Sequence, residues 1–211
     1  MARLNVNPTR MELKRLKTRL TTARRGHKLL KDKRDELMKQ FLDIVRENRD
    51  LRARVEQALI RAQKNFAVAS AVMSPEMLEQ SLLFPKQSVA LDMTFHNIMS
   101  VEVPEYTFQM KNDDPAEIFP YSFAMTSGEL DDAVQGLSDV MADLLRLAQM
   151  EKSAQLLAQE IEKTRRRVNA LEYVMIPQLD ETIRYITMKL DENERGNLTR
   201  LMKVKDMMIA E

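Results

Sequence analysis

The sequence predicts an all-α protein: a long antiparallel two-helix coiled coil with a small middle segment, a short helix plus a β-hairpin, at its closed end. Three observations lead to this prediction. Charged residues make up 31% of the 211 residues and aromatic residues 5%, with four glycines, a composition typical of long helices. Apolar residues recur in heptads through both ends of the chain. Five of the seven prolines and seven of the eleven aromatic residues fall between positions 74 and 126.

The first segment, residues 1–73, is expected to form one helix that starts near Asn7. Thr9 with Glu12 fits a capping box, in which each side chain satisfies a free backbone N–H of the first turn. Alternating steps of three and four residues from Leu13 to Ala62 meet fifteen positions, of which twelve are apolar. This sustained heptad seam is the strongest structural signal in the sequence.

The middle segment, residues 74–126, interrupts the heptads. The stretch "SPEMLEQSLLF" predicts a short helix with Ser74 as N-cap and Pro75 at its first position. The stretches "SVALDMTF" and "SVEVPEYTFQM" alternate apolar and polar residues and predict a β-hairpin. Pro104 places its strand at a sheet edge, because proline cannot donate a hydrogen bond to a neighbouring strand.

The third segment, residues 127–211, is predicted to be the second coiled-coil helix. Its seam runs from Leu130 to Leu190 and includes Leu137 and Met141. The phase of the seam slips once near residue 144 and again near Pro177, which should bend the helix. The two long helices are expected to fold back on each other, so that all three segments make one structural unit with both termini at its open end.

The charge distribution is asymmetric although the net charge is only +1. Residues 1–34 hold twelve Lys or Arg and two acidic residues, a net charge of +10, and the opposing stretch near the C-terminus is almost neutral. Such a basic arm is either a solvated face or a surface for an acidic partner. A nucleic acid is the less favoured partner, because residues 1–34 contain no aromatic side chain for base stacking.

No catalytic or cofactor-binding motif is present. The chain has no cysteine and two histidines far apart in sequence, and four glycines form neither a P-loop nor a GxGxxG turn. The sequence therefore predicts no catalytic residue, metal ligand or cofactor. The stretch "MARLNVNPTR" has no apolar core of a signal peptide, and no apolar run approaches about 20 residues, so direct membrane insertion is not expected.

One pair of segments is expected to pack closely in the coiled coil. Antiparallel alignment of the two seams, with residue numbers that sum to about 200, places Gly26 and His27 opposite the stretch "VNALEYV", residues 168–174, with Asn169 and Ala170 nearest to Gly26. Gly26 then lets the second helix approach, and Pro177 bends that helix nearby. The alternative is that Gly26 is a tolerated surface glycine. His27 is interpreted as a hydrogen-bonded seam residue rather than a metal ligand.

Three methionines near the C-terminus, Met202, Met207 and Met208, allow two interpretations. They fill gaps in the helix packing, which is the favoured interpretation, or they form an adaptable contact surface at an exposed tip.

Two long stretches carry a resemblance to a known family. "NPTRMELKRLKTRLTTARRGHKLLKDKRDELM" near the start and "RRRVNALEYVMIPQLDETIRYI" near the end resemble the signature stretches of the D subunit of the V-type/A-type rotary ATPases. The order of long helix, short β-containing middle and long helix is similar over the whole chain. The two stretches are long and occur in the family's order, which makes a chance match improbable.

The resemblance implies the central rotor shaft, a non-catalytic part that carries torque between the ATP-hydrolysing or ATP-synthesising head and the membrane ring that translocates ions. It implies as partners the catalytic and regulatory head subunits, the small F subunit of the stalk and the funnel-shaped subunit on the membrane ring. The chain is then expected on the cytoplasmic side, peripheral to the membrane. The expected head contacts are Arg10, Lys14, Arg15, Arg24, Arg25, Lys28, Met202, Met207 and Met208.

Two other functions are weighed against the rotor shaft. A non-rotary coiled-coil scaffold or tether predicts a stable symmetric homodimer. A nucleic-acid-binding coiled-coil arm predicts salt-dependent binding to RNA or DNA.

Overall fold

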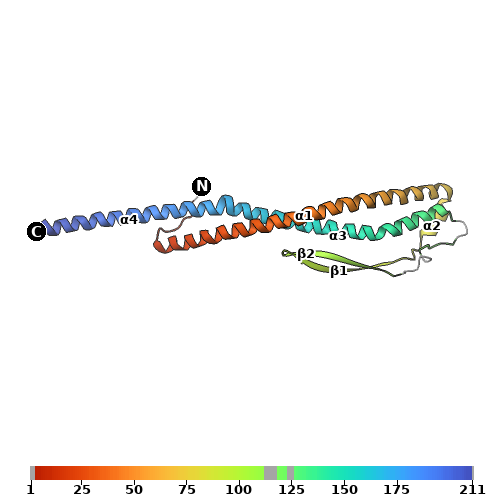
Figure 1. Cartoon of the computed structure of the whole chain (residues 1–211), viewed down its shortest axis with the longest axis horizontal. Helices are drawn as coiled ribbons and strands as arrows, with labels where there is room; N and C mark the ends of the chain where they lie inside the picture. The colour runs from red at the N-terminus through yellow and green to blue at the C-terminus, as the bar shows by residue number, and fades with distance from the viewer. Residues whose placement is uncertain (1–2, 112–117, 123–125, 211) are drawn as a thin grey trace. The chain divides into compact units, whose positions relative to one another are not determined.

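The computed structural model describes residues 3–111, 118–122 and 126–210 (Figure 1). Helix α1 (Arg10–Val72) is followed by the short helix α2 (Pro75–Leu82) and by strands β1 (Val89–Ile98) and β2 (Val101–Met110). The C-terminal part is a helical run of α3 (Gly128–Ala170), a π-helical turn η2 (Leu171–Met175) and α4 (Ile176–Ala210). A long helix at each end of the chain and a small hairpin between them confirm the predicted fold class.

The chain divides into two compact units. The terminal unit contains Met1–Glu36 and Ile161–Glu211, and the middle unit contains Leu37–Glu160. Each unit contains a part of α1 and a part of the C-terminal helical run.

The start of α1 follows from local hydrogen bonding. The Glu12 N–H donates to the Thr9 hydroxyl at 3.2 Å, and the Leu13 N–H donates to the Thr9 carbonyl at 3.0 Å. Thr9 is therefore the N-cap, which is its position in the predicted capping box. The predicted heptad seam is also confirmed, because all fifteen positions between Leu13 and Ala62 are buried or half-buried.

The seam on α3 differs in phase from the prediction. Leu137 and Met141 are 45% and 39% exposed, whereas Leu130, Ala133 and Val140 are buried. The placement of Leu137 and Met141 on the seam is therefore wrong. Both side chains instead line a cavity of about 270 Å³ beside the chain that connects α2 to β1. Apolar residues on two adjoining faces of one helix allow two heptad paths, and the sequence pattern does not distinguish them.

A close approach of helices does occur, but in the middle unit. A Cβ atom added to Gly136 on α3 would lie 3.5 Å from the Cβ atom of Ala62 on α1. Two small residues thus face each other where the backbones come close. Larger side chains at either position would separate the two helices.

The hairpin pairs β1 and β2 in antiparallel register, from Val89 opposite Met110 to Ile98 opposite Val101. Its two-residue turn is Met99–Ser100, and both residues have positive φ, 50° and 72°. Such a turn matches the twist of the strands but usually carries glycine or asparagine. The Asn97 side chain accepts a hydrogen bond from the Ser100 N–H at 2.9 Å, which compensates part of the strain.

The substitution Ser100→Gly tests whether the positive φ of Ser100 strains the turn. Glycine tolerates positive φ without a Cβ clash, so the substitution should stabilise the hairpin by about 1 kcal/mol. Amide hydrogen exchange of the hairpin measures this local stability. Thr94→Gly in the extended part of β1 is the control and should destabilise the hairpin. Equal effects of the two substitutions would contradict the assignment of strain to Ser100.

Candidate functional site

The terminal unit contains most of the residues that the sequence singles out, and an apolar cluster holds it together. Leu16 and Ala23 of α1 are buried against Leu179 and Ile186 of α4. Half-buried Leu13, Leu20 and Ile183 extend the same contact. The antiparallel seam of the coiled coil is therefore continuous in this unit.

A short segment before α1 covers part of this seam. The Leu4 N–H donates to the Thr182 hydroxyl at 3.2 Å, and the Leu4 side chain packs on the apolar cluster. The Arg3 guanidinium lies 4.6 Å from the centre of the Tyr185 ring, a cation–π contact. The segment thus folds back along α4.

The helical run changes its geometry directly before Pro177. Proline has no N–H, and in a regular α-helix its ring would clash with the carbonyl of Tyr173, four residues earlier. The π-helical turn η2 removes this conflict, and the Ile176 N–H donates to the Leu171 carbonyl, five residues back. The wider turn confirms the slip in phase that the sequence predicts here. It also leaves Tyr173 and Val174 exposed, at 63% and 51%.

The predicted close packing at Gly26 is wrong. A Cβ atom added to Gly26 would meet no heavy atom within 4 Å. Asn169 and Ala170, its expected contacts, are both exposed, and Pro177 is half-buried behind the π-helical turn. Gly26 is the tolerated glycine of the alternative interpretation.

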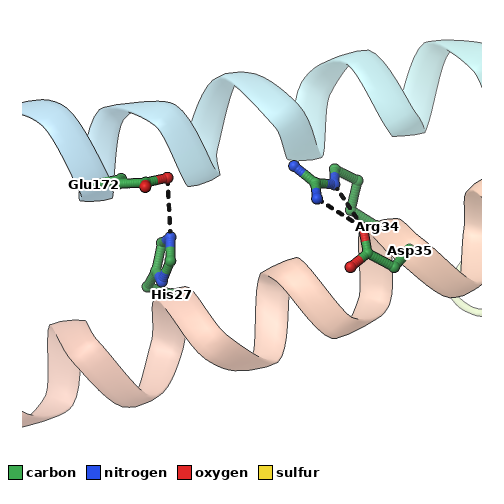
Figure 2. Close-up of polar contacts among 4 residues, drawn as sticks. All are labelled: His27, Arg34, Asp35 and Glu172. Carbon is green, nitrogen blue, oxygen red and sulfur yellow. Dashed lines mark hydrogen bonds and ion pairs between the residues drawn. The ribbon is translucent and has the colours of Figure 1, made fainter.

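The polar seam residue His27 does reach the opposite helix. Its Nε2 lies 3.4 Å from a carboxylate oxygen of Glu172, inside the stretch that the antiparallel alignment predicts (Figure 2). His27 is therefore a hydrogen-bonded seam residue, as predicted. Arg34 donates two hydrogen bonds to Asp35, at 3.0 Å and 2.7 Å (Figure 2).

The six basic residues expected at a partner surface fall into two groups. Three pair with acids of the same chain: Arg10 with Glu194, Arg15 with Glu12 at 3.4 Å, and Arg24 with Asp180 at 3.0 Å. The other three, Lys14, Arg25 and Lys28, are exposed and form no ion pair within the described residues. The chain itself thus neutralises half of the set, which the sequence pattern did not reveal.

The last part of α4 projects beyond the start of α1 (Figure 1). Arg10, the first residue of α1, pairs with Glu194, and every residue of α4 from 195 to 209 is exposed. We call residues 195–209 the projecting end. Met202, Met207 and Met208 are 65%, 61% and 75% exposed, so the gap-filling interpretation of these methionines is wrong.

The projecting end also carries apolar residues that the sequence interpretation passed over. Leu198, Leu201 and Ile209 are 58%, 65% and 72% exposed. With Met202 and Met208 they follow the spacing of one helical face. The end holds four basic residues and one acidic residue, a net charge of +3. The signal available in the sequence was this spacing of apolar residues.

Two further observations concern chemistry and membranes. Among residues 3–111, 118–122 and 126–210, no group of three or more His, Asp or Glu side chains is arranged to hold a metal ion. In the same part of the chain, no helix combines the length and apolar character needed to cross a bilayer.

The fold and this site define a class of protein: a coiled-coil stalk protein with an exposed helical end. The family model that describes the D subunit of ATP synthase matches residues 12–206. The chain belongs to this family of ATP synthase D subunits, as the resemblance of its two terminal stretches indicated. Membership makes it a stalk component of a V-type rotary ATPase, a complex of ATP synthesis and ion transport.

Curated relatives support the assignment over the full chain. The D subunit of the V-type ATP synthase from Acetivibrio thermocellus is 68% identical over 211 residues, which cover all of this chain and 95% of the relative. The proteins of the same name from Clostridioides difficile and Clostridium novyi are 66% and 60% identical. These two alignments cover 99% and 100% of this chain, and 94% and 98% of the relatives.

The glycine finding leads to a test of stability. Gly26→Ala should raise the free energy of unfolding by roughly 0.5–1 kcal/mol, because alanine favours the helix and meets no neighbouring atom. Urea unfolding followed by circular dichroism measures the change. Gly136→Val is the matched control and should lower the free energy of unfolding, since its side chain would press on Ala62. A loss of stability in Gly26→Ala would show that Gly26 is needed for packing.

The Arg24–Asp180 pair can be separated from any contact with a partner. Arg24→Asp should lower the free energy of unfolding by less than about 1 kcal/mol, because the pair is exposed. The double variant Arg24→Asp, Asp180→Arg should recover that loss. The same urea titration measures both variants, and no recovery in the double variant would mean that the two side chains do not interact.

Proposed function

We propose that the chain is the central rotor shaft of a V/A-type rotary ATPase. It transmits torque between the head, where ATP is hydrolysed or synthesised, and the membrane ring that translocates ions. In this role the chain carries no catalytic group and lies on the cytoplasmic side, peripheral to the membrane. The observation that carries the proposal is the projecting end of α4, an exposed helix with an apolar face and no covering element within the described chain.

The projecting end is suited to a socket in the head. Leu198, Leu201, Met202, Met208 and Ile209 present an apolar face to solvent, and such faces generally mark a binding surface. Methionines adapt to changing neighbours because their side chains are unbranched and polarisable. A shaft that meets each head subunit in turn needs this kind of contact. The net charge of +3 favours a socket rimmed by acidic residues.

The exposed basic residues support a second set of contacts with the catalytic and regulatory head subunits. Lys14, Arg25 and Lys28 have no ion pair within the described chain, so an acidic loop of the head can approach them. Ion pairs of exposed side chains are individually weak. Weak contacts suit a rotating part, because a single tight contact would oppose rotation. Arg10, Arg15 and Arg24 contribute less in this proposal, since acids of the same chain already neutralise them.

Torque passes along the shaft through the seam. In the terminal unit, interlocked apolar side chains and the Arg24–Asp180 pair oppose sliding of α1 along α4. In the middle unit, Leu51 and Val55 pack against Val140 in the same way. Close-packed side chains resist displacement, so twisting one helix twists its neighbour.

The middle unit offers a surface for the other stalk partners. Met38, Leu42 and Val45 of α1 are 40%, 46% and 38% exposed and lie on one helical face. A helix of the small F subunit of the stalk could pack on this face and add a third strand to the coil. The funnel-shaped subunit on the membrane ring is the remaining partner in this proposal.

The test is ATP-driven rotation after reconstitution with the head subunits, with a bead attached to this chain. The triple variant Leu201→Ser, Met202→Ser, Met208→Ser removes the apolar face of the projecting end. Each buried apolar side chain contributes about 1.5–3 kcal/mol, so the affinity for the head should fall at least about tenfold and rotating beads should become rare.

Met188→Ser is the matched control, since Met188 is 71% exposed on α4 but lies outside the projecting end. It should rotate like the unaltered chain, and circular dichroism should show equal helicity in all variants. Normal assembly and rotation of the triple variant would reject the proposed socket. A stable homodimer in sedimentation would favour a scaffold instead, and salt-dependent RNA binding would favour a nucleic-acid-binding arm.

A further inference from the structure

The hairpin of the middle unit presents an unusual amount of apolar surface. Every residue of β1 from Val89 to Asn97 is exposed. On one face of the strand, Leu91, Met93 and Phe95 are 48%, 54% and 61% exposed. Water-facing apolar side chains at three successive positions of one strand face are more than the scattered apolar residues of an ordinary surface.

Within the part of the chain that the structure describes, no second strand pairs with the outer edge of β1. The hydrogen bonds of the hairpin identify the backbone groups on this edge. On the other strand, the Tyr106 N–H points away from β1 and donates to the Gln149 side chain of α3 at 3.2 Å. Met93 lies opposite Tyr106. In a pair of this kind the two residues do not bond to each other, so the N–H and C=O of Met93 also point away from the partner strand. The Lys111 N–H donates to the Ser88 carbonyl, so the backbone groups of Ser88 point toward β2. Because this direction alternates along a strand, the backbone groups of the other even-numbered residues of β1 also point toward β2.

The same three residues therefore combine two features. The side chains of Leu91, Met93 and Phe95 lie on the exposed face, and their backbone groups point to the free edge. Pro104 lies opposite Phe95, at an outward position, so its missing N–H leaves the β1–β2 ladder intact. The usual devices that protect a free edge, a proline, a lysine or a bulge, are absent from the described strand β1.

The charge of the hairpin indicates what kind of segment fits. Residues 89–110 contain Asp92, Glu102 and Glu105 and no lysine or arginine. Asp92 lies on the face opposite to Leu91 and Met93, because successive side chains alternate. A second copy of this chain is disfavoured, since antiparallel pairing of two β1 edges centred on Met93 would place the two Asp92 carboxylates at diagonal positions of one face, where like charges repel.

We propose that β1 accepts an extended segment of a partner protein as a third strand, and that this segment alternates apolar and basic residues. Its apolar side chains lie beside Leu91, Met93 and Phe95, and its basic side chains lie on the face of Asp92. The backbone ladder supplies affinity, and the alternation supplies specificity. This binding site goes beyond the rotor function and does not depend on the projecting end.

The test uses the full chain and a fluorescent seven-residue peptide of alternating lysine and valine, read by fluorescence anisotropy at low salt. Binding should slow amide exchange at Leu91, Met93 and Phe95 and leave the inward amides of Ala90 and Thr94 unchanged. Met93→Pro removes an outward N–H, and Asp92→Lys reverses the charge. Each should raise the Kd at least about tenfold. Phe95→Ser should weaken binding without touching the backbone edge.

The matched control is Glu79→Lys, which makes the same charge change at an exposed position of α2. It should leave the Kd unchanged, and a peptide with glutamate in place of lysine should not bind. Equal binding by all variants, or no binding of the lysine peptide, would overturn the proposal. A concentration-dependent homodimer that Met93→Pro abolishes would also overturn it, in favour of a second copy. Any of these results would leave rotation of the reconstituted complex normal. Rejection of the strand-binding site is therefore distinguishable from rejection of the rotor function.

Discussion

Burial of one apolar stripe between antiparallel helical segments is the interaction on which the rest of the structure depends. In the terminal unit Leu16 and Ala23 meet Leu179 and Ile186, and in the middle unit Leu51 and Val55 meet Val140. Each buried side chain gains about 1.5–3 kcal/mol, while ordering of the backbone opposes folding on a similar scale. Because the seam is narrow, most other side chains stay at the surface, where partners can reach them.

Local irregularities occur where the sequence conflicts with a regular helix or hairpin. Pro177 lacks the N–H that an α-helix needs, and the π-helical turn η2 accommodates it without ending the helix. Gly136 accommodates a close approach to Ala62. The turn Met99–Ser100 keeps positive φ without glycine because the hairpin register leaves two residues to connect Ile98 with Val101. Each irregularity thus keeps a longer element continuous.

The exposed apolar surfaces of the projecting end and of the hairpin have different characters. The projecting end is helical and basic, whereas the hairpin is extended and acidic. A helix end with flexible methionines suits a contact that changes during a cycle. A free strand edge suits a contact that persists, because a ladder of backbone hydrogen bonds forms and breaks as a set. The two proposed contacts would therefore differ in lifetime because different secondary structures present them.

The sequence by itself determined the order of elements and the family. The informative patterns are local: the heptads from Leu13 to Ala62, the alternation in the strands and the helix cap at Thr9. Each depends on residues close together in the sequence, so it can be recognised without the tertiary structure. The sequence also predicted His27 as a hydrogen-bonded seam residue opposite residues 168–174, and the structure identifies Glu172 in that stretch as the partner.

The tertiary structure decided those features that depend on which residues of the opposite helix lie across the seam. Only the packed helices show that Gly26 faces open space, that Gly136 meets Ala62, and that Leu137 lies off the seam. The pairing of Arg24 with Asp180 and the exposure of Met202 likewise depend on where one helix ends against the other. A heptad pattern fixes which face of a helix is apolar, but the axial offset between two helices is set by the sum of many side-chain contacts between distant residues.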